Sequence, residues 1–171
     1  MRQIVSIHSF RGGTGKSNVT ANLAALIARR GKRVAVIDTD LQSPGVHFVL
    51  GLENDRVVRT LSDFFGGKCD LREAAYDMSR HVHDDGAESG ASGDGALYLL
   101  PSSMRLEDIT RIIADGYDVD RLNQHFKRLV EELELDYLFI DTHPGLNRET
   151  MLTTSISNVL VVLIRPDTQD Y

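Results

Sequence analysis

The chain has 171 residues, of which 42% are hydrophobic and 26% are charged, and its formal net charge is −6 at pH 7. These values indicate one globular domain with its own core and exclude a general electrostatic attraction to nucleic acid or anionic membranes. The single cysteine, Cys69, excludes an intramolecular disulfide framework. The N-terminal residues match no secretory or transit pattern and no apolar run is long enough to cross a bilayer, so we expect a cytoplasmic protein.

The first predicted elements are a strand at residues 4–7, a glycine-rich loop, and a helix at about residues 16–30. The loop and helix start carry the sequence SFRGGTGKS over residues 9–17, with three glycines within four residues. Glycines let backbone N–H groups approach a polyphosphate, and the start of the helix adds unpaired donors and a positive dipole end. A lysine and a hydroxyl at the helix start suit the outer phosphates and Mg²⁺. The predicted phosphate-binding residues are Gly12, Gly13, Thr14, Gly15, Lys16, Ser17 and Asn18.

The loop departs from the standard phosphate-loop pattern, because Phe10 stands where that pattern has glycine and Arg11 precedes the double glycine. One alternative is a glycine-rich turn that binds nothing. Another is a dinucleotide fingerprint, which Asp38 would suit but which lacks its third glycine at Asn18. The Lys16-Ser17 pair favours the phosphate loop over both alternatives.

The helix at residues 16–30 places Val19, Leu23, Leu26 and Ile27 at helical spacing, and we expect them to form its buried stripe. The continuous apolar run at residues 33–38 then predicts a parallel strand that is covered on both faces. Strand, helix and strand in this order form a right-handed βαβ unit. Ligands of such sheets bind outside the carboxyl ends of the strands.

The rest of the chain continues the alternation of helices and strands. We predict strands at residues 97–100, 137–141 and 159–164, and helices at 60–65, 71–78, 106–114, 119–133 and 149–156. Residues 79–96 are rich in Gly, Ser and Asp and predict a mobile surface loop; the acids and histidines at 81–85 are expected to be solvated rather than to bind a metal. The predicted fold class is α/β, with a mostly parallel sheet and helices on both faces, the three-layer arrangement of phosphate-loop NTPases. The apolar last strand predicts that the single domain, residues 1–171, is incomplete at its C-terminus or is covered by a partner.

Two acidic segments follow predicted strands at the edge of the sheet where the glycine loop lies. They are Asp38-Thr39-Asp40 and Asp141-Thr142-His143-Pro144-Gly145. One acid of the first pair can fix Mg²⁺-bound waters while the other orients an attacking water, and Asp141 can hold a water of the metal. The predicted metal-associated residues are Ser17, Asp38, Asp40 and Asp141. For His143 we favour a solvent-facing turn over a position at the phosphates.

These three motifs, in this order, resemble the ParA/MinD family of ATPases, which carry a deviant Walker A motif. The resemblance covers nearly the whole chain and implies ATP and Mg²⁺ as ligands, with ATP held between two subunits of a homodimer that hydrolysis releases. It implies that Lys16 contacts the phosphates, that Asp40 positions the hydrolytic water, and that Arg11 replaces the family's signature lysine, which reaches the partner's phosphates. It leaves open DNA, a membrane or a protein cargo adaptor as the attachment partner.

The leading hypothesis is therefore an ATPase switch in which Lys16, Asp40 and Arg11 are catalytic and which positions or regulates cellular cargo. The main alternative is a metabolic enzyme of the same class that phosphorylates a small carboxylate before ligation or amidation. A non-hydrolysing nucleotide sensor is disfavoured by Asp40, and an electron-transfer reductase is disfavoured because Cys69 lies far from residues 141–145.

Overall fold

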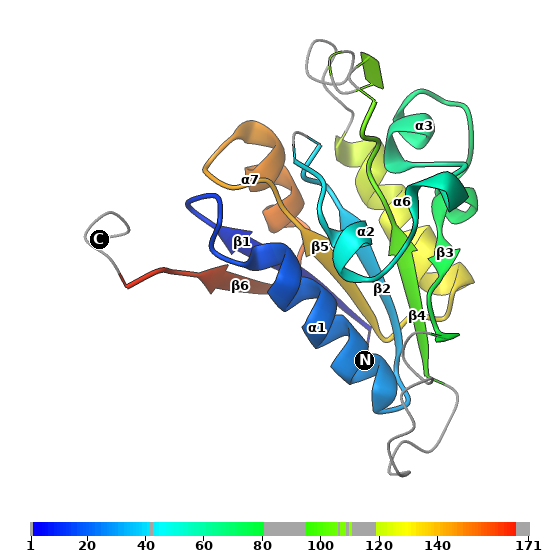
Figure 1. Cartoon of the computed structure of the whole chain (residues 1–171), viewed down its shortest axis with the longest axis horizontal. Coiled ribbons are helices and arrows are strands. Elements are labelled where there is room, and N and C mark those ends of the chain that lie inside the picture. The colour runs from blue at the N-terminus through cyan, green and yellow to red at the C-terminus, as the bar shows by residue number, and fades with distance from the viewer. Residues whose placement is uncertain are drawn as a thin grey trace.

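The computed structural model describes residues 2–41, 43–80, 95–105, 107–108, 110 and 119–166. These residues form one sheet in the order β3-β4-β2-β5-β1-β6 (Figure 1). β3 runs antiparallel to β4, and every other neighbouring pair is parallel. The strands are β1 (Gln3–Ser9), β2 (Arg33–Asp38), β3 (Tyr76–Asp77), β4 (Ala96–Leu100), β5 (Tyr137–Asp141) and β6 (Val159–Leu163).

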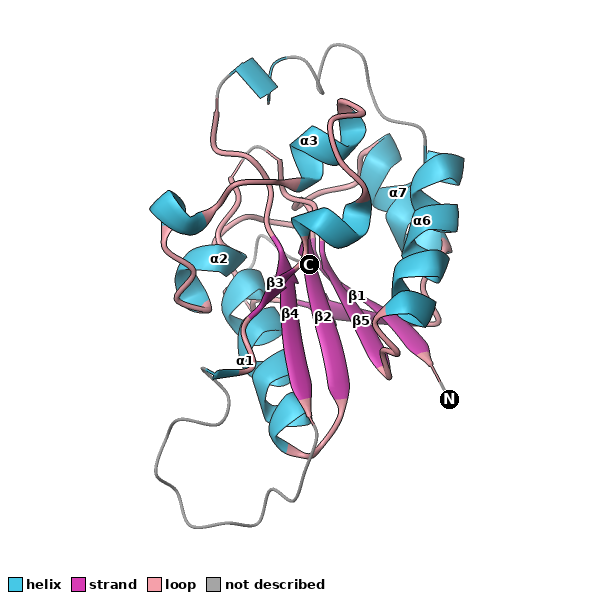
Figure 2. Cartoon of the chain, turned by 90° about the vertical axis from the view of Figure 1, so that its right-hand side faces the viewer, coloured by secondary structure: helices cyan, strands magenta, loops and turns pink. Residues whose placement is uncertain are grey.

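Helices cover both faces of this sheet (Figure 2). Helix α1 (Lys16–Arg29) packs on one face, and α6 (Val119–Glu132) packs on the other, where it contacts α7 (Arg148–Ser155). Two short helices, α2 (Val46–Val49) and α3 (Leu61–Phe65), and two 3₁₀ turns, Asn54–Arg56 and Leu71–Ala74, fill the connection between β2 and β3. This three-layer, mostly parallel arrangement confirms the predicted fold class.

The α6 face of the core consists of apolar side chains at helical spacing. The side chains of Leu122, Phe126, Leu129 and Leu133 are all buried against Ala35, Ile37, Leu138 and Ile140 of the central strands. Full burial of a large aliphatic or aromatic side chain contributes about 1.5–3 kcal/mol. This face therefore supplies a large share of the energy that holds the sheet in place.

The α1 face corrects the predicted stripe. Val19 and Leu26 are exposed, and Leu23 and Ile27 pack only at the margin of the core. The buried positions are Lys16, Thr20, Ala21, Ala24 and Ala28. Small alanine side chains let the helix lie close to the sheet, so the larger side chains are displaced to the edges of the contact. The spacing of the large apolar residues therefore predicts the wrong buried face of α1.

The segment after α3 also differs from prediction. The expected helix at residues 71–78 is instead the 3₁₀ turn Leu71–Ala74 followed by β3, which pairs with β4 through Tyr76 and Asp77. Strand pairing overrides a weak local helical pattern here. The predicted helix 60–65 is confirmed as α3, and Thr60 caps its start through a hydrogen-bonded box with Asp63. Most of the predicted helix 106–114, and the segment 81–94 with its acids and histidines, lie outside the described residues.

Strand β6 is the outermost strand on the β1 side of the sheet. Val159, Leu160 and Val162 are each more than 40% exposed. The described residues therefore cover these side chains only in part. That a further part of the protein or a partner covers this apolar strand stays a prediction. No helix among these residues combines the length and apolar character needed to pass through a bilayer.

Candidate functional site

The glycine loop connects β1 to α1 at the carboxyl edge of the sheet. Gly13 and Gly15 adopt left-handed φ angles of 74° and 84°, which side-chain-bearing residues rarely tolerate. A Cβ added at Gly12, Gly13 or Gly15 would meet no atom within 4 Å, so all three glycines face open space. Gly15 is the N-cap of α1 and supplies no side-chain cap, which leaves the first N–H groups of the helix available to a ligand.

The loop borders a cavity of about 340 Å³. Every predicted phosphate-binding residue lines this cavity. Asp40 from the first acidic segment and Pro144 from the second line it as well. Its lining is Ser9, Arg11, Gly12, Gly13, Thr14, Gly15, Lys16, Ser17, Asn18, Asp40, Ser43 and Pro144. The Thr14 hydroxyl is buried without a hydrogen-bond partner among the described residues. An open glycine cradle with an unsatisfied hydroxyl and uncapped helix donors suits an anion such as a phosphate chain.

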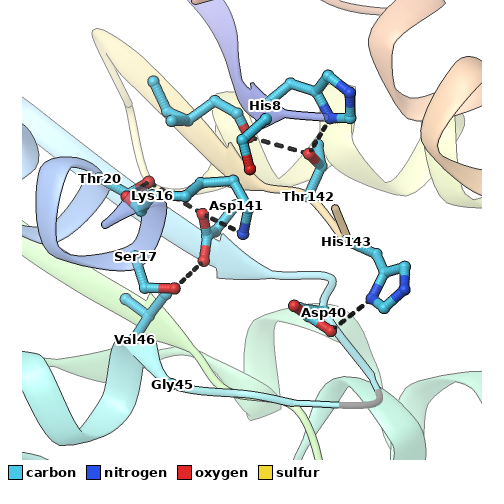
Figure 3. A network of polar contacts seen from close by, with 12 residues as sticks. His8, Lys16, Ser17, Thr20, Asp40, Gly45, Val46, Asp141, Thr142 and His143 are labelled. Atoms are coloured by element: carbon cyan, nitrogen blue, oxygen red, sulfur yellow. Dashed lines mark hydrogen bonds and ion pairs between the residues drawn. The ribbon is translucent and has the colours of Figure 1, made fainter. Parts of the chain in front are cut away.

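Asp141 joins the first turns of α1 to the end of β5 (Figure 3). Its Oδ1 lies 3.2 Å from the Lys16 Nζ and accepts a 3.1 Å hydrogen bond from the Thr20 hydroxyl. Its Oδ2 accepts a 2.7 Å hydrogen bond from the Ser17 hydroxyl. Burial raises the pKa of Asp141, and the positive charge of Lys16 partly offsets this rise. The Asp141 carboxylate thus contacts both Lys16, which the sequence predicts to bind phosphates, and the Ser17 hydroxyl, which it predicts to bind Mg²⁺.

Asp38 lies beside Asp141 in the sheet register but does not line the cavity. Its carboxylate is fully buried and accepts hydrogen bonds from the backbone N–H groups of Asp40, Gly45 and Val46. Burial, followed by repulsion from Asp141, raises the pKa of Asp38 to about 7. Asp38 therefore fixes the path of the chain from β2 into α2, while Asp40 is the acid of this pair that reaches the cavity.

His143 corrects the expectation of a solvent-facing turn. Its Nδ1 lies 2.8 Å from Oδ1 of Asp40, so the second acidic segment contacts the first. Gly145 of the same segment donates a backbone hydrogen bond to the Ser9 carbonyl, which keeps this loop beside the end of β1. These contacts surround the cavity with groups from three separate loops.

A second histidine, His8, was not singled out from the sequence. Its Nδ1 lies 2.9 Å from the Thr142 hydroxyl, and that hydroxyl donates to the Ile7 carbonyl at 3.0 Å. Because the hydroxyl proton is already used, Nδ1 of His8 must be the donor in this pair. Burial, with a smaller contribution from Lys16, lowers the pKa of His8, which favours the neutral ring. The available signal was its position at the end of β1, directly ahead of the glycine loop.

The donor set suits Mg²⁺ bound together with a phosphate chain rather than a metal held by protein alone. No group of three or more His, Cys, Asp or Glu side chains forms a metal cage within the described ranges. Mg²⁺ commonly binds one or two protein oxygens, substrate phosphates and several waters. The Ser17 hydroxyl and the Asp141 carboxylate, 2.7 Å apart, are the residues that would hold it here.

Comparison with known proteins agrees with this geometry. Residues 5–163 match the family described as the CobQ/CobB/MinD/ParA nucleotide binding domain. The chain is 30% identical over 163 residues to an uncharacterised ATP-binding protein of Methanocaldococcus jannaschii, covering 95% of this chain and 53% of the relative. It is also 30% identical over 169 residues to the septum site-determining protein MinD of Bacillus subtilis, covering 98% of this chain and 54% of the relative.

Among solved structures, the fold is similar to that of the septum site-determining protein MinD from Pyrococcus horikoshii, complexed with Mg-ADP. The TM-score is 0.76 at 27% identity, and the match covers 99% of this chain and 60% of that chain. The chain thus spans about half the length of the curated relatives described above.

Proposed function

This chain belongs to the CobQ/CobB/MinD/ParA family of nucleotide-binding domains, and from this premise we propose that it binds ATP with Mg²⁺ and hydrolyses it to ADP and phosphate. The observation that carries the proposal is the cavity in which the glycine loop, Lys16, Ser17 and Asp40 meet. The P. horikoshii relative bound to Mg-ADP supports the choice of an adenine nucleotide with Mg²⁺.

Each residue of the cavity has a separate role in the proposed reaction. The glycine N–H groups and Lys16 bind the phosphates and neutralise their charge, and Ser17 with Asp141 holds Mg²⁺, which polarises the phosphates when bound. Binding redirects Lys16 and Ser17 from Asp141 toward the ligand. Asp40 accepts a hydrogen bond from the attacking water and orients it toward the terminal phosphate.

We further propose that hydrolysis switches the protein between an ATP-bound homodimer and a released form, which positions or regulates a cargo. Support comes from the MinD relatives and from Arg11, which lines the cavity at the start of the loop. A guanidinium at that place suits the phosphates of a second subunit, because its planar fork binds two oxygens at once. Asp38 contributes to the switch by holding the segment that carries Asp40. The proposed attachment partner of the switch is DNA, a membrane or a protein adaptor.

The primary test combines calorimetry with Mg²⁺ and ATP and a phosphate-release assay. We expect binding by the unmodified chain, loss of binding in Lys16→Ala, and retained binding in Asp40→Ala with turnover lower by roughly 10²- to 10⁴-fold. Absence of any binding heat with Mg²⁺ and either ATP or GTP would refute the proposal. Phosphate release that starts only when a small carboxylate is added would instead favour the metabolic alternative.

The switch is tested by measuring the mass of the protein in solution with and without ATP. Asp40→Ala should accumulate as a dimer with ATP, while Arg11→Ala should bind ATP but dimerise less. Arg30→Ala, an exposed cation beyond the far end of α1, is the matched control and should behave as the unmodified chain. Equal dimerisation of Arg11→Ala and Arg30→Ala would rule out the cross-subunit role of Arg11.

A further inference from the structure

Asp40 and His143 come from two loops that are more than 100 residues apart in the chain. Asp40 follows β2 by two residues, and His143 follows β5 by two residues. The His143 Nδ1 and the Asp40 Oδ1 are 2.8 Å apart, with side chains 25% and 8% exposed. Limited exposure restricts competition from water, so this contact constrains both side chains (Figure 3).

The hydrogen-bond directions at Asp40 follow from the chemistry of the groups. An ionised carboxylate only accepts hydrogen bonds, so Nδ1 of His143 carries the proton and donates to Oδ1. The backbone N–H of Ser43 donates to the same oxygen at 3.1 Å. The other oxygen, Oδ2, has no hydrogen-bond partner among the described residues, and Asp40 lines the cavity beside the glycine loop. One oxygen is therefore held by the protein, and the other is available to a water.

From this asymmetry we propose that His143 is a positioning residue, which holds Asp40 so that Oδ2 faces the hydrolytic water. The inference deepens the proposed function and rests on it, because it assumes that Asp40 orients that water. His143 is the side chain among the described residues that fixes Asp40 from a different loop, whereas Ser43 is a local backbone contact.

The same short segment also carries Asp141, whose carboxylate contacts Lys16 and Ser17. Residues 141–143 therefore connect the start of α1 with Asp40, because the Asp141 side chain contacts α1 and the His143 side chain, two residues later, contacts Asp40. A ligand that draws Lys16 and Ser17 away from Asp141 changes the contacts of the segment that positions Asp40. This places His143 between ATP binding and water orientation.

The test compares turnover and ATP affinity in a series of substitutions. His143→Ala should lower kcat by about 10- to 100-fold, the effect typical of losing a residue that orients a functional ligand. KM for ATP should stay within about twofold, because the lost interaction orients the water rather than the substrate. His143→Asn, whose amide nitrogen can occupy the Nδ1 position, should restore most of kcat, and His143→Gln should not. His125→Asn, a half-buried histidine on α6, is the matched control and should leave kcat unchanged.

Two further measurements separate this inference from the function on which it rests. The double variant Asp40→Ala/His143→Ala should be no slower than Asp40→Ala alone, because His143 acts through Asp40. Nitrogen NMR should find the His143 proton on Nδ1 in the unmodified chain and a shift to Nε2 in Asp40→Ala. Unchanged kcat in His143→Ala, while Asp40→Ala is inactive, would overturn the inference and leave the proposed function standing. An unmodified chain that binds ATP without releasing phosphate would overturn both.

Discussion

At the scale of single residues, the carboxylate of Asp141 accepts three side-chain hydrogen bonds within the site. It receives hydrogen bonds from Lys16, Ser17 and Thr20 at the start of α1, and it is completely buried. Burial of a charge is unfavourable unless donors compensate for the lost water. The three donors therefore explain how an acid can stand at this point in the sheet.

Thr20 provides the first prediction. Its hydroxyl is fully buried and lies 2.9 Å from the Lys16 carbonyl and 3.1 Å from Asp141. Thr20→Val keeps the shape but removes the donor, so we expect the free energy of unfolding to fall by about 1 to 3 kcal/mol. Thr20→Ser should recover most of the loss. Urea denaturation of the three proteins measures this effect, and equal stability of Thr20→Val and the unmodified chain would contradict it.

His8 predicts a pH dependence of stability. Its pKa is lowered by burial from the ordinary value of 6.5, so below that pH the unfolded chain binds a proton that the folded chain resists. Stability then rises with pH, because the unfolded state binds more protons in this window. His8→Asn keeps a donor near Thr142 but does not titrate. The unmodified chain should therefore lose stability relative to His8→Asn as pH falls below about 6.5, with no further change above about 7.

Denaturation curves for both proteins at several pH values measure the His8 effect. Taking the difference between the two proteins removes the opposite contribution of Asp38, whose raised pKa lowers stability as pH increases toward 7. A difference that is constant from pH 5 to 8 would show that His8 is not held in its neutral form.

At the scale of elements, α1 lies close to the sheet because its sheet-facing positions are small. Ala21, Ala24 and Ala28 are buried there, and the chain that enters β4 passes directly against the end of the helix at Gly95. A Cβ at Gly95 would collide with the carbonyl oxygen of Ala28 and would lie 3.1 Å from Cα of Gly31. Both neighbours are backbone atoms, which cannot move aside as a flexible side chain can.

Gly95→Ala should consequently destabilise the fold. We expect a loss of about 1 to 3 kcal/mol in the free energy of unfolding, since overpacking forces backbone shifts. Gly12→Ala is the matched control for stability, because its Cβ meets nothing within 4 Å and its φ angle is not left-handed. Thermal and urea unfolding of both variants test the prediction, which fails if the two substitutions have equal effects.

Local sequence determines elements that are consecutive in the chain, but it does not determine contacts between residues that are far apart in the chain. The strand, glycine loop and helix at residues 3–29 are consecutive, so local sequence is enough to predict these elements. The predicted phosphate-binding residues line one cavity, and their role toward phosphate stays a prediction. The contacts of His8 with Thr142 and of His143 with Asp40 join residues separated by 134 and 103 positions. They depend on the strand order, in which β5 lies between β1 and β2. A predicted parallel sheet implies that the carboxyl ends of its strands lie at one edge. It does not give the strand order, and so it does not tell which side chains contact each other at that edge.

Strand β3 and the roles of the two acids in the first segment have a similar explanation. Tyr76 and Asp77 are extended because β4 offers a free edge, which is a tertiary effect. Asp38 and Asp40 were both assigned to the metal from their position after a strand. Side chains two residues apart on an extended chain point the same way, but the chain turns after Asp38, so Asp38 bonds to the start of α2 while Asp40 reaches the cavity.

At the scale of the whole molecule, the sheet is finished differently at its two ends. On one side, β3 pairs antiparallel with β4 and is only two residues long, which limits further pairing. On the other side, β6 pairs with β1 and has no second strand partner among the described residues. Leu160 and Val162 lie two residues apart on the same face of β6, and they are 46% and 47% exposed. Exposed apolar edge strands favour pairing with other chains.

The 171-residue chain should therefore self-associate without nucleotide as its concentration rises, through β6. Leu160→Lys combined with Val162→Lys should reduce this association while lowering stability little, because both side chains are already half exposed. Leu26→Lys removes an exposed leucine of α1, 55% accessible, that lies on the surface of a helix and offers no strand edge; it is the matched control. Sedimentation velocity over a range of concentrations measures the effect. If Leu26→Lys reduces association as much as the β6 substitutions do, general surface hydrophobicity rather than the sheet edge is responsible, and the prediction is wrong.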